Sequence, residues 1–381
     1  MDKDELRAWL RLSLTDGIGN EAARRLLACF GSPQAVFEQT EAALRHVVTP
    51  LQAHALMSAP HAVAVQCVRT QQWLKQQPDS HRHALWTLGD AQYPPELLQL
   101  ADPPLMIYVV GQTQASLGNA IAIVGSRNPT PQGAQTAEQF GEALGAAGLC
   151  VVSGLALGVD GAAHTGALRN PAAPHTHWRT VAVVGTGLDR VYPRQHQALA
   201  GEIALHGLLM SEYHLGTPPL AHNFPKRNRL IAALGLGTLV VEAALKSGSL
   251  ITAKLALELG REVLAIPGSI HASQSHGCHA LIRQGAKLVE NEQDVLEELQ
   301  LAPQQQANLF AHTFSPTSID TSNPEHPLLA QMGFGPVSLD ALQARSGLDT
   351  ASLQAQLLTL ELDGVVGRLA GGLFQQLAHP N

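Results

Sequence analysis

Residues 120–127 read AIAIVGSR, an apolar run of strand length that passes directly into a glycine, a hydroxyl and a cation. Comparable short apolar runs follow along the chain, separated by stretches with helical spacing. These runs lie at residues 121–124, 149–153, 181–184, 208–211, 238–241, 263–266 and 287–289. Strands that alternate with helices form βαβ units, and wholly apolar strands are typical of a sheet covered on both faces. The pattern therefore predicts an α/β fold with a mostly parallel sheet.

The regions that flank this alternation have different patterns. Residues 1 to about 77 contain short amphipathic helical stretches at 5–14, 20–30 and 62–77. Residues 301–326 are polar and contain proline, as expected of a linker. Beyond them, two helical stretches at 339–345 and 351–363 precede a hairpin at 365–374, the order of a winged helix. We expect an N-terminal helical domain at 1–87, a central domain at 88–300, a linker at 301–326 and a winged-helix domain at 327–381.

The charge of the chain is low and unevenly distributed. Its 381 residues include 24 Lys+Arg and 31 Asp+Glu, a net charge of −7, and 14% of the residues are charged against about 25% in typical soluble domains. Residues 300–381 hold Arg345 and Arg368 against six acidic residues. A generally basic surface for nucleic acid is therefore excluded, whereas one local basic site is not.

Composition also limits the cellular location of the protein and the ligands that it is expected to bind. The apolar runs are far shorter than the roughly 20 residues that cross a membrane, and the acidic N-terminus is unlike a signal peptide. The four cysteines are far apart, which favours free thiols in the cytoplasm. His271, His276, Cys278 and His279 cluster without the spacing of a standard zinc site. We expect a cytoplasmic protein without membrane contact, metal or cofactor.

Ligands of open parallel sheets bind beyond the carboxyl ends of the strands, so the loops there are the candidate site. After the first strand, Gly125 and Ser126 precede Arg127, whose guanidinium suits phosphate. The next glycine is Gly133, so a dinucleotide-binding fingerprint is absent. A plain tight turn is the alternative for this loop.

The most informative segment is residues 223–231, where Lys226, Arg227 and Arg229 fall within four residues at the start of a helix. In a chain that uses charge sparingly, this cluster indicates an anion site, with the neighbouring Asn228 as a polar partner. Phe224 could stack on a base or could be a core residue. We expect the cations here and Arg127 to hold phosphates.

A further loop, at residues 246–249, ends at another helix. Lys246, Ser247 and Ser249 could form a phosphate cradle, and the same hydroxyls could simply cap the helix. Neither a phosphate-binding loop of the Gly-x-x-x-x-Gly-Lys-Ser/Thr type nor a nucleophile elbow occurs in the sequence. We therefore predict binding without catalysis and name no catalytic residue.

Taken together, these segments resemble the DNA-processing protein A family (DprA, also called Smf). The resemblance covers roughly residues 88–299. It rests on IVGSR at 123–127, SGLA at 153–156, FPKRNR at 224–229, VEA at 241–243, SGSLITA at 247–253 and IPG at 266–268.

The resemblance implies an extended Rossmann-like central domain, a small N-terminal domain like a sterile-alpha-motif domain, and a C-terminal winged helix. It further implies a homodimer that binds single-stranded DNA in natural transformation, protects the incoming strand and helps to load RecA recombinase for homologous recombination. The positions that match the family's DNA pocket are Gly125, Ser126, Arg127, Gly154, Phe224, Arg227, Asn228 and Arg229, with the loop at 246–249 nearby.

Two other functions stay open at this point. Nucleoside-monophosphate phosphoribohydrolases combine a Gly-Ser-Arg loop with a Gly-x-Gly-Thr-x-x-Glu-like segment, and GLGTLVVE at 235–242 comes close, with Glu242 as the acid. One extra residue separates threonine from glutamate, and the preceding Pro-Gly-Gly is absent. A purely protein-binding scaffold would leave the cations at 226–229 unexplained.

Overall fold

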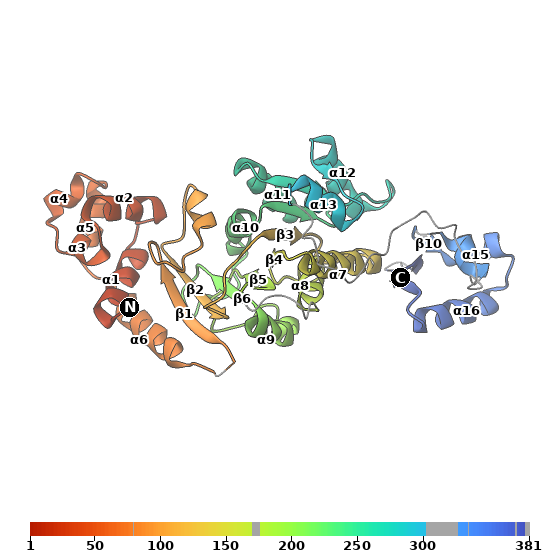
Figure 1. The fold of residues 1–381 in the computed structure, drawn as a ribbon, viewed down its shortest axis with the longest axis horizontal. Helices are drawn as coiled ribbons and strands as arrows, with labels where there is room; N and C mark the ends of the chain where they lie inside the picture. The colour runs from red at the N-terminus through yellow and green to blue at the C-terminus, as the bar shows by residue number, and fades with distance from the viewer. Residues whose placement is uncertain (79, 170–175, 302–326, 334, 370–371, 378–381) are drawn as a thin grey trace.

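The computed structural model describes all residues except 79, 170–175, 302–326, 334, 370–371 and 378–381. The predicted linker at 301–326 therefore lies almost wholly outside the described residues. Figure 1 shows a central sheet with the N-terminal helices at one end of the molecule and the C-terminal unit at the other.

The centre of the fold is a 9-stranded sheet with the order β1-β2-β6-β5-β4-β3-β7-β8-β9. The predicted parallel strands are found, and their neighbours pair in parallel register. They are β3 (Ala120–Val124), β4 (Cys150–Ser153), β5 (Thr180–Val183), β6 (Leu208–Ser211), β7 (Gly237–Val240), β8 (Glu262–Ala265) and β9 (Lys287–Leu288). The mostly parallel α/β fold is confirmed.

Two antiparallel strands extend the sheet beyond the sequence prediction. β1 (Arg82–Thr87) pairs with β2 (Met106–Gly111), and β2 pairs with β6. β2 is buried along its whole length, although pairs of prolines precede it at 94–95 and 103–104. The sheet therefore begins at Arg82, inside the range 1–87 expected for the N-terminal helical domain.

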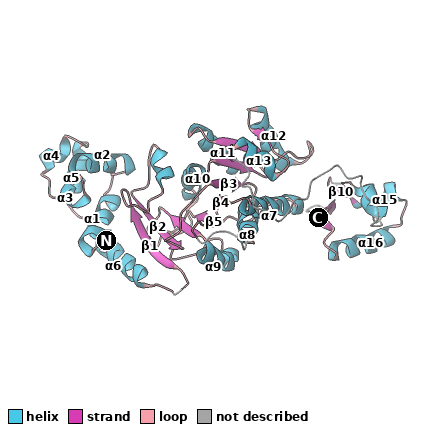
Figure 2. Cartoon of the chain, viewed as in Figure 1, coloured by secondary structure: helices cyan, strands magenta, loops and turns pink. Residues whose placement is uncertain are grey.

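Helices cover both faces of the sheet (Figure 2). One apolar core joins the strands to the short helix η1 (Pro95–Gln99), α10 (Asn223–Leu234), α11 (Ser249–Glu258) and α12 (His276–Arg283). The opposite face packs on α7 (Pro131–Ala146), α8 (Val159–Leu168) and α13 (Glu292–Glu298). α9 (Gln197–His206) follows η2 (Arg194–His196), and η3 (Ser273–Ser275) precedes α12.

The N-terminal helices pack on the sheet. A single core cluster joins them to α9 and to one face of β2, where Tyr108 is fully buried. The helices are α1 (Lys3–Leu14), α2 (Asn20–Phe30), α3 (Pro33–Phe37), α4 (Glu41–Arg45), α5 (Pro50–Leu56) and α6 (Ala62–Lys75). The N-terminal region is therefore continuous with the central fold through apolar packing.

The C-terminal unit has its own small core. Its elements are α14 (Pro327–Met332), β10 (Val337–Ser338), α15 (Leu339–Ser346), α16 (Thr350–Leu362), β11 (Val366–Leu369) and β12 (Leu373–Gln376), with the sheet order β10-β12-β11. The two predicted helices and the hairpin are present. The unit touches the central domain at the start of α7, where Gln375 donates a hydrogen bond to Gln132.

No helix in the described ranges is both long and apolar enough to cross a membrane. The same residues contain no cluster of three or more His, Cys, Asp and Glu suited to a metal. Cys278 is fully buried, and a ring nitrogen of His279 lies 3.0 Å from the carbonyl oxygen of Gly268. A ring nitrogen of His276 likewise lies 3.0 Å from the carbonyl oxygen of Ile270, so both of these histidines contact backbone carbonyl groups.

Candidate functional site

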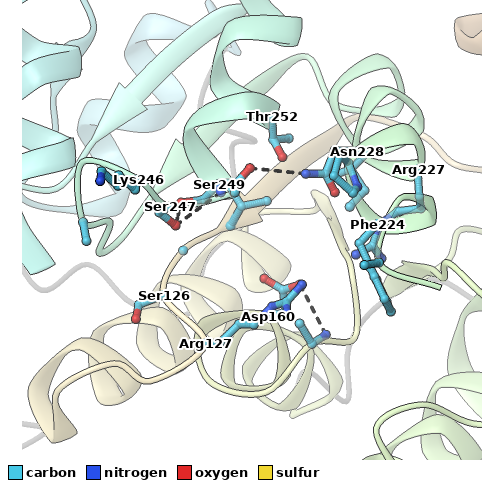
Figure 3. Close-up of a pocket in the computed structure, with 18 of the residues that line it drawn as sticks. Ser126, Arg127, Asp160, Phe224, Arg227, Asn228, Lys246, Ser247, Ser249 and Thr252 are labelled. Atoms are coloured by element: carbon cyan, nitrogen blue, oxygen red, sulfur yellow. Dashed lines mark hydrogen bonds between the residues drawn. The ribbon is translucent and has the colours of Figure 1, made fainter. Parts of the chain in front are cut away.

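A cavity of about 690 Å³ lies beyond the carboxyl ends of the parallel strands, as the fold class predicts. Figure 3 shows side chains converging on it from the loop after β3, from α10 and from the loop before α11. Most of the predicted site residues line this cavity: Gly125, Ser126, Arg127, Phe224, Arg227, Asn228, Lys246, Ser247 and Ser249.

The loop after β3 supplies an exposed cation. Gly125 is required by packing, because a Cβ atom there would lie 2.7 Å from a methyl carbon of Val159. The hydroxyl of Ser126 accepts a hydrogen bond of 3.1 Å from the backbone N–H of Asn128 and so holds the turn. Arg127 is exposed, and its guanidinium carbon lies 5.4 Å from the centre of the Phe224 ring, within the range of a cation–π contact.

The helix α10 presents one face to the cavity. Phe224, Arg227, Asn228 and Ile231 line it, which is the spacing of residues on one side of a helix. Asn228 donates a hydrogen bond of 3.3 Å to the carbonyl oxygen of Gly248 and ties α10 to the loop before α11. Phe224 is partly exposed at the cavity, so the alternative of a core residue is not what the structure shows.

Arg227 forms the floor of the cavity. Its side chain is buried and donates hydrogen bonds to the carbonyl oxygens of Gly154, at 2.7 Å, and Val183. Burial lowers the pKa of Arg227 to about 10, and the nearby carboxylate of Asp160 acts against that shift. Burial also raises the pKa of Asp160, which Arg227 opposes. The two opposite charges therefore leave the floor close to neutral.

Gly154 was predicted to touch DNA, but it does not line the cavity. A Cβ atom at this position would lie 2.6 Å from both the Arg227 guanidinium and the Asp160 carboxylate. The glycine therefore makes room for these two buried charges.

Lys226 and Arg229 were predicted to hold phosphates here, and the structure turns both away from the cavity. Arg229 is buried and forms ion pairs with Glu212 at 2.5 Å and with Asp102 at 3.3 Å. Lys226 lies exposed outside the cavity lining. Because successive helical residues point about 100° apart, the run of cations in α10 cannot share one face.

The second exposed cation of the cavity comes from the loop before α11. Lys246 is exposed at the rim, and the hydroxyls of Ser247 and Ser249 lie 2.7 Å apart (Figure 3). The backbone N–H of Ser249 donates a hydrogen bond of 3.3 Å to the Ser247 hydroxyl. These serines order the first turn of α11 beside Lys246.

One aromatic residue of the lining was not singled out from the sequence. Tyr192 lies in the loop after β5, is 45% exposed, and has its ring centre 5.7 Å from that of Phe224. A tyrosine before a proline is the only local signal, and it does not reveal which loop the ring will meet.

Glu242 is held by Thr130, the residue that precedes α7. Its carboxylate accepts hydrogen bonds from the backbone N–H and the hydroxyl of Thr130, at 2.9 Å and 2.6 Å. It lines a second cavity of about 340 Å³, whereas Arg127 lines the first. Burial raises the pKa of Glu242. Both carboxylate oxygens of Glu242 are therefore engaged by Thr130.

Comparisons with known proteins identify the family of the chain. Residues 84–300 match the family model of the DNA recombination-mediator protein A, and residues 312–372 match that of the DprA winged helix domain. Protein Smf of Escherichia coli is 41% identical over 305 residues, which cover 79% of this chain and 78% of that protein. The DNA processing protein DprA of Streptococcus pneumoniae is 45% identical over 215 residues, which cover 56% and 74%.

A solved structure has the same fold. The X-ray structure of DNA processing protein A from Streptococcus pneumoniae matches with a TM-score of 0.61 and 34% sequence identity, over 78% of this chain and 98% of that one.

Proposed function

The chain belongs to the DNA recombination-mediator protein A family, and from that premise we propose that it binds single-stranded DNA in the cavity between Arg127 and Lys246. The main observation in support of this proposal is that two exposed cations and accessible aromatic rings line one cavity. Cations suit the phosphates of a strand, and aromatic rings suit bases that are free to unstack. A duplex keeps its bases stacked and offers no free ring faces to the cavity.

The chemistry of the lining also supports binding that tolerates any sequence. Asn228, an amide that could read a base edge, already donates to the Gly248 carbonyl oxygen. Ser247 and Ser249 are engaged with each other. Phosphate attraction and base stacking then supply most of the affinity, and neither depends strongly on base identity.

We further propose that the protein acts without catalysis, in the cytoplasm and as a homodimer, in natural transformation. There it would protect incoming single strands and help to load RecA recombinase onto them. The family's description as a recombination mediator supports the RecA step. The engagement of both Glu242 oxygens by Thr130 supports a role in binding only.

Fluorescence anisotropy with labelled oligo-dT of several lengths and with matched duplexes tests this proposal. We expect saturable binding to the single strands and much weaker binding to the duplexes. Incubation with nucleoside monophosphates should release no free base. Equal affinity for both forms of DNA, or release of free base, would contradict the proposal.

A further inference from the structure

The rim of the cavity carries two aromatic rings with very different accessibility. The Tyr192 residue is 45% exposed, whereas Phe224 is more deeply buried. Phe224 is contacted on its ring by the Arg127 guanidinium, 5.4 Å from the ring centre, and it also meets Tyr192. Much of the Phe224 ring is therefore already covered, while Tyr192 still offers a large free surface.

The geometry of the two rings excludes a base sandwiched between them. Their centres are 5.7 Å apart and their planes are inclined by 41°, a separation at which aromatic side chains are in direct contact. No space remains for a third ring. A base can only lie on an outer surface of the pair, and Tyr192 supplies the more open one.

Tyr192 also has little to do in the fold itself. Nearly half of its surface is exposed, and its hydroxyl makes no hydrogen bond within the described part of the chain. The contrast is Tyr213, whose hydroxyl donates a hydrogen bond of 3.0 Å to the carbonyl oxygen of Asn223 at the start of α10. A large exposed ring without a structural contact of this kind is suited to a ligand.

We propose that Tyr192 is the principal base-stacking residue of the cavity and that Phe224 and Arg127 support its ring. This inference rests on the proposed binding of single-stranded DNA. The phosphates on either side of the stacked base would then meet Arg127 and Lys246, which line the same cavity.

Variants of Tyr192 test the inference on two probes, oligo-dT and a strand of the same length whose sugars lack bases. Tyr192→Ala should weaken oligo-dT binding by about 5- to 150-fold, the equivalent of about 1–3 kcal/mol per stacked base. Tyr192→Phe, which keeps the ring, should bind like the wild type, and Phe224→Ala should lose less than Tyr192→Ala. On the abasic strand, wild type and Tyr192→Ala should bind equally.

The outcomes separate this inference from the proposed function. If the wild type binds oligo-dT and Tyr192→Ala binds it equally well, the stacking role is wrong and the proposed function stands. An equal loss on oligo-dT and on the abasic strand would also overturn the stacking role, because it would show an effect on the protein rather than on a base. If the wild type fails to bind oligo-dT, the proposed function and this inference both fail.

Discussion

Arg127 and Lys246 are the exposed cations of the cavity, and they come from loops that are far apart in sequence. The three clustered cations of α10 lie in three different environments. Arg227 forms the floor beside Asp160, Lys226 faces solvent, and Arg229 is buried with Glu212. A dense run of charge in a sequence thus indicates where a site is without showing which of its members contact the ligand.

Arg229 should matter for stability. Arg229→Met would leave the Glu212 carboxylate, whose side chain is 6% exposed, without its main partner. Removing one member of a buried ion pair costs about 3–5 kcal/mol. We therefore expect a fall of this size in the free energy of unfolding, measured by urea denaturation at neutral pH.

The matched control for Arg229 changes its partner as well. Adding Glu212→Gln to Arg229→Met removes the uncompensated charge, so part of the lost stability should return. If Arg229→Met is as stable as the wild type but loses DNA affinity, this arginine contacts DNA after all.

At the scale of elements, the N-terminal helices hold the loop that leads into α10. A ring nitrogen of His214 lies 3.2 Å from the Ser13 hydroxyl of α1, and the other lies 3.1 Å from the Tyr108 hydroxyl of β2. Arg69 of α6 donates a hydrogen bond of 2.9 Å to the carbonyl oxygen of Leu215. These hydrogen bonds fix residues 214 and 215, in the segment between β6 and α10, to the N-terminal region and to β2.

The His214 contacts predict a loss of stability in acid. Burial lowers the pKa of His214 to about 4, from 6.5 when the ring is free. Between these values the unfolded chain binds more protons than the folded chain, so the free energy of unfolding falls as the pH falls. The contribution of this one group is about 3 kcal/mol from pH 7 to pH 4. His164, whose pKa burial lowers to about 3, acts in the same direction.

Urea denaturation across this pH range can isolate the His214 contribution. His214→Gln should be less stable than the wild type at pH 7 and should lose less stability on acidification. His271→Gln, a change at an exposed histidine, should follow the wild-type curve. A His214→Gln curve parallel to that of the wild type would rule out this histidine as the source.

Sequence patterns predicted the parallel strands but missed β1 and β2, and the difference has a physical reason. The parallel strands β3 to β7 were predictable because each is mostly apolar and is buried at every residue. β2 is equally apolar, but its partners β1 and β6 are set by long-range pairing that local spacing does not encode. The role of Tyr192 could not be predicted for the same reason. The order of the strands in the sheet, rather than the local sequence, brings its loop to Phe224.

At the scale of the whole molecule, the winged helix lies beside the central domain, and none of its described residues lines the cavity. Its contact lies at the start of α7, where Gln375 meets Gln132. α16 contains no lysine or arginine, and its Leu358 and Leu362 are 56% and 80% exposed. A helix that enters a DNA groove is normally basic, so this surface is better suited to a protein.

Truncation after Leu301 should therefore leave DNA binding nearly intact. Since all lining residues of the cavity belong to the central domain, we expect the affinity for oligo-dT to change by no more than about twofold, with phosphate attraction preserved. The truncated and complete chains can be compared by anisotropy at one salt concentration. A loss of tenfold or more would assign part of the DNA interface to the winged helix.

The salt dependence of oligo-dT affinity tests the central claim most directly. With Arg127 and Lys246 as the phosphate contacts, log K against log salt should have a slope of about −1.4, at about −0.7 per contact on a single strand. Arg127→Ala should reduce the slope to about −0.7, whereas Lys226→Ala, which removes the same charge outside the cavity, should leave it unchanged. A slope that is unchanged in Arg127→Ala, or that falls equally in Lys226→Ala, would contradict the binding of DNA in this cavity.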